Sequence, residues 1–245
     1  MTETIQIRAG LEAQYADIYT PAALAAIRSL APLDRDVKAV MRARIERRKA
    51  RFRDHHRIAF LDPDATIART SIKVRDARAG AFDGSEIPPD LQRQWIQGTG
   101  PAAKPGVSLE RSIRNVAYAL LSGADGWMFD GEDALGQTRT MSLENQRNLK
   151  LAIARDDVFM RAAEGVAAEM NAWAEGFLGR KIVPAWRGQL DFTTVIFRAR
   201  GLHLDDRHIR NADGTGFSAS IADVCLYVTN NHARLLGAGR SIVLY

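Results

Sequence analysis

The sequence predicts an α/β protein, in which a mainly helical region, residues 1–90, precedes a parallel sheet with crossover helices in residues 91–245. Apolar strand-like runs alternate with amphipathic helical patterns in the second region. This alternation is typical of parallel strands joined by right-handed crossovers. The first region carries helix start signals and long polar stretches instead. From the alternation we count about four strands in the second region.

The composition, with 46% hydrophobic and 26% charged residues, is that of an ordinary globular protein. No apolar run approaches the length of a membrane span, and the N-terminus lacks the apolar centre of a signal peptide. We therefore expect no membrane partner. The single cysteine, Cys225, rules out an internal disulfide and indicates a reducing, cytoplasmic location. Its apolar, helix-like surroundings predict a buried and unreactive thiol.

Much of the net charge of +5 lies between Arg35 and Arg57. In this segment Val37, Met41 and Ile45 recur four residues apart, which predicts an amphipathic helix with a basic outer face. We favour a solvated helix face and expect no nucleic-acid partner. A nucleic-acid-binding module remains the alternative, which requires affinity for DNA or RNA that falls steeply with salt. The segment lacks the interleaved aromatic residues that stack on bases.

Helix signals open the chain. Thr20 is a predicted N-cap, since Pro21 follows it at the first helical position, and Pro32 ends that helix. Asp34 is then predicted to cap the basic helix. The next fifty or so residues are rich in Asp, Pro, Gly and Thr, a composition that indicates loops. Short strands are predicted at residues 71–74 and 94–97 within this stretch.

Regular patterns return at Ser108, a predicted cap for a helix with a clear 3.6-residue apolar period. A buried strand is predicted at residues 126–130. Helices are predicted to begin at Ser142 and at Asp156–Asp157, and the second of these ends at Gly179.

The β-branched and aromatic run at residues 193–197 predicts a strand that is buried on both faces. A polar loop is predicted from residue 202 to residue 216, followed by a helix at 220–236. The final residues, 242–245, predict a fourth strand. The histidines of the polar loop, His203 and His208, match no standard zinc spacing, and we expect them to be solvated.

Charged side chains follow two of the predicted strands. Asp130, Glu132 and Asp133 come at the end of one, and Arg198 and Arg200 come at the end of the next. Parallel α/β folds place their chemistry at the carboxyl ends of strands. Three crowded carboxylates repel one another, so a cation is their natural partner. This edge of the sheet is therefore the predicted functional site.

Several motifs resemble the amino-terminal half of the malate synthase family: SGADGWMFDGEDALGQ, IFRARGLHL and SASIADVCLYVTNNHARLL. The segments IPPDLQRQWIQGTGP and TPAALAAI fit the same family. The resemblance covers nearly the whole chain and is weakest between Asp54 and Phe82. The two strand ends, FDGED and FRARG, are specific as a pair at this separation, whereas either alone is a weak signal.

The resemblance implies the first half of a TIM (β/α)8 barrel that follows the helical region. It implies an acyltransferase of the glyoxylate cycle, which condenses acetyl-CoA with glyoxylate to give malate and CoA, with magnesium as cofactor. Arg198 matches the family's active-site arginine and is the expected catalytic residue. We expect Asp130, Glu132, Asp133 and Arg200 to bind substrate or to orient the groups that do.

The magnesium ligands and the catalytic base of the family match no residue of this chain and are expected beyond Tyr245. We therefore expect the isolated chain to be inactive and to need the second half of the barrel, or self-association, to cover its open sheet. A malyl- or citramalyl-CoA lyase similar to the citrate lyase β-subunit is the enzymatic alternative. The long helical region before the first strand favours malate synthase, because such lyases begin near their first strand.

Overall fold

The computed structural model describes residues 5–92, 94–99, 106–132 and 138–245. Its centre is a four-stranded sheet whose neighbours follow chain order, β2-β3-β4-β7, and each neighbouring pair is parallel. The predicted α/β class and parallel sheet are therefore confirmed. The strands are β2 (Trp95–Thr99), β3 (Gly126–Asp130), β4 (Thr194–Arg198) and β7 (Val243–Leu244).

Helices join the strands of this sheet, and most begin at the predicted signals. Ser108 accepts a hydrogen bond from the Arg111 N–H at 3.4 Å, and Asp156 accepts one from the Val158 N–H at 2.9 Å. The helix that begins after Asp156 ends at Gly179, which has a φ of +67°. The sequence did not predict α8. The helices are α5 (Leu109–Leu120), α6 (Met141–Ala154), α7 (Asp157–Leu178), α8 (Trp186–Phe192) and α9 (Ala219–Gly237).

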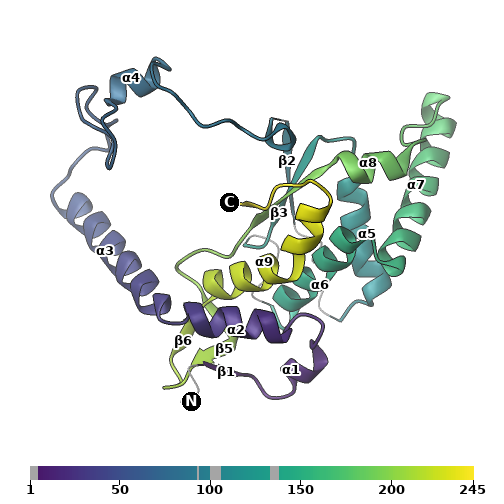
Figure 1. The fold of residues 1–245 in the computed structure, drawn as a ribbon, viewed down its shortest axis with the longest axis horizontal. Coiled ribbons are helices and arrows are strands. Elements are labelled where there is room, and N and C mark those ends of the chain that lie inside the picture. The colour runs from purple at the N-terminus through teal and green to yellow at the C-terminus, as the bar shows by residue number, and fades with distance from the viewer. Residues whose placement is uncertain (1–4, 93, 100–105, 133–137) are drawn as a thin grey trace.

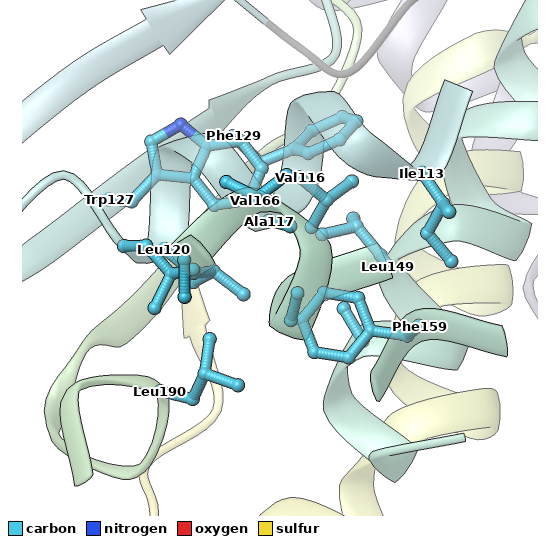
Figure 2. Close-up of a cluster of buried hydrophobic side chains, with 14 of the residues drawn as sticks. Ile113, Val116, Ala117, Leu120, Trp127, Phe129, Leu149, Phe159, Val166 and Leu190 are labelled. Atoms are coloured by element: carbon cyan, nitrogen blue, oxygen red, sulfur yellow. The ribbon is translucent and has the colours of Figure 1, made fainter. Parts of the chain in front are cut away.

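An aromatic row forms the middle of the core on the helical side of the sheet. The Trp127 and Phe129 rings lie 5.5 Å apart, those of Phe129 and Phe197 5.7 Å, and those of Phe197 and Tyr227 4.7 Å. Figure 2 shows Trp127 and Phe129 beside the apolar side chains of the surrounding helices. The predicted burial of β4 on both faces is wrong for Val195 and Ile196, which are only half-buried.

The segment predicted to be a polar loop instead forms part of a second sheet. β5 (Asp205–Asn211) pairs with β6 (Gly216–Ser218) and with β1 (Ile5–Ile7), all antiparallel, in the order β1-β5-β6. The prediction failed because the buried positions of β5 include Asp206 and His208, so the strand carries no apolar alternation.

The N-terminal helices pack against this second sheet and against α9 (Figure 1). Thr20 caps α2 as predicted, because its hydroxyl accepts a hydrogen bond from the Ala23 N–H at 3.3 Å. The predicted cap at Asp34 is wrong. Asp34 lies in the first turn of α3, where its buried carboxylate accepts hydrogen bonds from the N–H and hydroxyl of Ser218. The helices are α1 (Leu11–Gln14), α2 (Pro21–Leu30) and α3 (Leu33–Arg53).

Beyond its first turns, α3 extends away from both sheets, and the chain returns through α4 (Val74–Arg78) and the short 3-10 helix η1 (Pro89–Leu91) (Figure 1). The basic side chains of α3 are mostly exposed, as predicted for a solvated face. The strand predicted at residues 71–74 is wrong, since only an isolated bridge joins Thr66 and Lys73. A boundary near residue 90 stays a prediction. Among the described residues, no helix has both the length and the apolar character to cross a membrane.

We expect Phe129→Ala to lower the free energy of unfolding by about 3–5 kcal/mol, the usual cost of deleting a buried aromatic side chain. The Phe129 ring is fully buried and contacts aromatic rings on both sides. Urea unfolding followed by circular dichroism measures this loss. Phe177→Ala is the matched control, since Phe177 is 75% exposed, and we expect a loss of about 1 kcal/mol or less. Equal losses for both variants would contradict the assigned core.

Candidate active site

The ends of β3 and β4 bring an acid and a guanidinium together. Asp130 and Arg198 are partners in the parallel register, and Arg198 Nη1 donates to Asp130 Oδ2 at 2.7 Å. The Asp130 side chain is 3% exposed and that of Arg198 is 21% exposed. The pair therefore consists of a buried carboxylate and a guanidinium that solvent can still reach.

Three further contacts orient this pair. The Glu132 N–H donates to Asp130 Oδ1 at 3.0 Å, so both carboxylate oxygens of Asp130 are engaged. Glu132 Oε2 lies 3.8 Å from Arg198 Nη2, and the Tyr245 ring centre lies 5.9 Å from Arg198 Cζ. The guanidinium is thus held by carboxylates on one side and faces an aromatic ring on another.

Two glycines lie tightly against the pair, one against backbone and one against side chains. The Gly131 N–H donates to the Arg198 carbonyl at 2.9 Å, and a Cβ on Gly131 would lie 2.7 Å from that same oxygen. A Cβ on Gly201 would lie 2.9 Å from Glu132 Oε2 and 2.7 Å from His203 Nδ1. Larger residues at these positions would force the two strand ends apart or displace Glu132 and His203.

The structure thus adds His203 to the neighbourhood of the site, close to Gly201 and Glu132. Sequence reasoning missed it because its loop spacing matches no metal or catalytic pattern. The FRARG motif, which begins the same segment, was the one signal that pointed to this region.

Of the predicted site residues, Asp133 lies outside the described part of the chain. Within the described part, no three or more His, Cys, Asp or Glu side chains are placed to hold a metal ion together. Asp130 and Glu132 both face Arg198. These residues do not by themselves fit a magnesium site.

Arg200 is only 2% exposed, unlike Arg198. The Asp223 carboxylate accepts hydrogen bonds from its N–H, Nε and Nη2 at 2.9, 2.8 and 2.7 Å, and Asp206 accepts one from Nη2 at 2.6 Å. Burial alone lowers the pKa of Arg200, but the carboxylates of Asp223 and Asp206 outweigh it and raise the pKa above its ordinary value. This network fixes the segment after β4 against α9 and β5.

No protein-family model matches the chain. It is 29% identical to the glyoxysomal malate synthase of Zea mays over 241 residues, 97% of this chain and 36% of that protein. It is also 29% identical to the malate synthase of Oryza sativa subsp. japonica, over 94% of this chain and 34% of that protein. The malate synthase of Streptomyces clavuligerus is 28% identical over 83% of this chain and 31% of that protein.

The resemblance to malate synthases is confirmed. It extends over most of the chain, and the chain spans about a third of the length of these malate synthases. The strand-end pair of Asp130 and Arg198 lies within the matched region. Some of the relatives are named as glyoxysomal malate synthases, so a cytoplasmic location for this chain stays a prediction.

We expect Asp223→Asn to lower the free energy of unfolding by about 3–5 kcal/mol, because it leaves the buried charge of Arg200 with one carboxylate fewer. Urea unfolding at neutral pH measures the change. Asp205→Asn is the matched control, since Asp205 is the neighbour of Asp206 in β5 but its side chain is 59% exposed. We expect a change below about 0.5 kcal/mol for that variant. An Asp223→Asn protein as stable as wild type would show that the network does not hold the fold.

We also expect stability to fall as the pH drops below about 6.5, the ordinary pKa of histidine. Burial lowers the pKa of His208 in the folded state, and the cations of Arg200 and Arg8 lower it further, against the opposing charge of Asp206. The unfolded chain therefore binds a proton in a pH range where the folded chain does not. Urea unfolding between pH 7.5 and 5 measures this slope.

His208→Gln removes the titrating group and is expected to flatten that slope. His203→Gln, at an exposed position, is the matched control and is expected to retain it. If both variants keep the full pH dependence, another group is responsible for it.

Proposed function

We propose that this chain supplies the guanidinium of a malate synthase-type acyltransferase that condenses acetyl-CoA with glyoxylate in the glyoxylate cycle. One observation carries the proposal. Arg198 is held by Asp130 at the carboxyl ends of two parallel strands, in a chain that is similar to malate synthases over most of its length. Chemistry in parallel α/β folds is placed at this end of the strands.

The sheet is consistent with the proposed first half of a TIM barrel. Its four strands are parallel and adjacent in chain order, and helices come between β3 and β4 and between β4 and β7, where β5 and β6 of the other sheet also precede the helix. This succession is the one in which a (β/α)8 barrel is built. In Figure 1 the helices α5, α6 and α7 lie on one side of the sheet, as the outer ring of such a barrel does.

The reaction needs a group that stabilises negative charge on oxygen. When a base removes a proton from the acetyl methyl group, the enolate attacks the aldehyde carbon of glyoxylate and charge develops on the aldehyde oxygen. The planar guanidinium of Arg198 can donate two parallel hydrogen bonds to glyoxylate oxygens, which a lysine ammonium cannot do. A donor fixed before the reaction needs no reorganisation as the charge appears.

Asp130 and Glu132 then serve as positioning residues. Asp130 is buried and bonded on both oxygens, so it holds the guanidinium in one orientation. Glu132, at 3.8 Å, limits the movement of the other guanidinium nitrogen. The described carboxylates do not fit the magnesium site that the resemblance implies, so Asp130 and Glu132 are assigned to Arg198 alone.

The direct test measures CoA release from acetyl-CoA with glyoxylate and magnesium, with malate identified as the product. The assay uses the 245-residue chain and also the complete protein, if the reading frame continues past Tyr245. We expect activity where the remaining family ligands are present and none in the 245-residue chain by itself. Cleavage of malyl-CoA or citramalyl-CoA without any condensation would instead favour the lyase.

We expect Arg198→Lys in the active protein to lower turnover by about a hundredfold or more, while binding of acetyl-CoA changes less. The charge is retained, but the bidentate geometry is lost. Steady-state kinetics with each substrate varied in turn measures the two effects separately. In the 245-residue chain itself, glyoxylate binding by saturation-transfer NMR should weaken in the same variant.

Arg111→Lys is the matched control, since Arg111 is an exposed residue of α5. We expect it to retain full turnover and glyoxylate binding. Turnover of Arg198→Lys within a few-fold of wild type would remove Arg198 from the mechanism.

A further inference from the structure

A cavity of about 490 Å³ lies at the opposite end of the sheet from Arg198. It reaches Trp127 and Thr194 at the starts of β3 and β4, whereas Asp130 and Arg198 are at the ends of those strands. Strands rise by about 3.3 Å per residue, so the two places are roughly 10 Å apart along β3 and β4. The cavity is therefore separate from the candidate active site.

Most of the wall is apolar. Leu120 comes from α5, Leu149 from α6, Leu190 from α8 and Val195 from β4. Figure 2 shows Leu120 and Leu190 below the Trp127 ring in this view, and all three side chains line the cavity. The volume is in the range of pockets that hold small organic molecules, which are mostly lined by apolar side chains with a few polar groups.

The polar part of the wall is dominated by arginines: Arg155, Arg234 and Arg240. Among the described residues that line the cavity, Asp191 is the one carboxylate, and its side chain is 77% exposed. The neighbouring carboxylate of Asp90 already accepts hydrogen bonds from the N–H and hydroxyl of Ser241, at 2.8 and 2.9 Å. The wall thus carries more positive than negative charge.

The charges of these arginines also act on one another. Burial lowers the pKa of Arg155, Asp191 opposes this, and the nearby cations Arg240 and Arg234 lower the pKa further. A bound anion would relieve this repulsion, since its charge would be shared among the guanidinium groups.

Helix capping accounts for part of this arrangement. Arg155 donates to the Ala152 carbonyl at 2.6 Å and Arg234 to the Ala154 carbonyl at 3.2 Å, both at the end of α6. Arg240 donates to the Phe192 carbonyl at 3.1 Å, at the end of α8. Arg155 also donates to the Leu190 carbonyl and lies 3.5 Å from the Asp191 carboxylate. A guanidinium has five N–H donors, so the single carbonyls that Arg234 and Arg240 bind do not exhaust those two side chains. Capping also gives no reason for the apolar cavity beside the three arginines.

We propose that this cavity binds a small organic anion with an apolar body. Its carboxylate or comparable acidic group would lie against Arg234 and Arg240, and its apolar part against Leu120, Leu190 and Val195. Arg155, whose side chain is 27% exposed, would support the anion while still capping α6. This inference is independent of the proposed acyltransferase function.

The test compares two probes of equal chain length, octanoate and octan-1-ol, by isothermal titration calorimetry on the 245-residue chain. We expect octanoate to bind at one site per chain with a Kd about tenfold or more below that of octan-1-ol, as for hydrogen bonds to a charged group. The double variant Arg234→Gln, Arg240→Gln should remove this preference without disturbing the core, since Arg234 is exposed and Arg240 half-buried.

A second variant tests the apolar part. Ala233 lines the cavity and is exposed, so Ala233→Trp should fill the entrance and abolish binding of both probes. Trp173→Ala is the matched control, because it removes an exposed aromatic residue of α7. No described residue of α7 lines the cavity, so this variant should leave octanoate binding unchanged. Far-UV circular dichroism confirms that each variant is folded.

Several outcomes would overturn the proposal. These are the absence of octanoate binding, equal affinity for the two probes, a preference for octanoate that survives the double arginine variant, or loss of binding in Trp173→Ala. Because the double arginine variant changes only surface and half-buried positions, the proposal can be tested even if Ala233→Trp does not fold.

Discussion

The parallel register between β3 and β4 is the constraint on which the candidate site depends. It sets Asp130 directly beside Arg198, and the hydrogen bond of 2.7 Å between them joins the ends of both strands. A shift of one residue would place the two side chains on opposite faces of the sheet. The aromatic row from Trp127 to Tyr227 anchors this register, because the same strands carry its rings into the core.

Two arginines that are two residues apart have different roles for a physical reason. Arg198 belongs to β4 and remains partly exposed, whereas Arg200 follows the strand and is enclosed by α9 and β5. A buried guanidinium is tolerated only if carboxylates compensate its charge, and Asp206 and Asp223 do so. The buried network thereby gives the strand end a rigid base from which Arg198 reaches the surface.

The second sheet ties the beginning of the chain to its later part. β1 pairs with β5, and α2 packs on α9, so residues far apart in sequence share one apolar cluster. Asp34 adds a polar link from α3 to Ser218. The cavity with its arginines is lined by α5, α6, α8 and α9 and by β3 and β4, and so depends on packing around the parallel sheet.

Periodicity and start signals in the sequence by themselves determined most helices and the parallel strands. Ser108, Asp156 and Gly179 mark helix ends through local hydrogen bonds or backbone conformation, which need no distant partner. The apolar runs of β3 and β4 were equally clear, and the acids and arginines that follow them located the candidate site. Asp130 and Arg198 could be foreseen as neighbours because parallel strands end at the same edge.

Only the tertiary structure decided which polar segments form strands and which partners their buried charged side chains have. β5 carries buried Asp206 and His208, residue types that are typical of loops. Arg200 and the backbone N–H groups of β5 supply the partners of the Asp206 carboxylate. Asp34 likewise has the position of a cap in the sequence, but its carboxylate accepts a hydrogen bond from the N–H of Ser218, far along the chain. Local patterns report apolar burial, whereas the burial of a charge depends on partners that folding alone brings together.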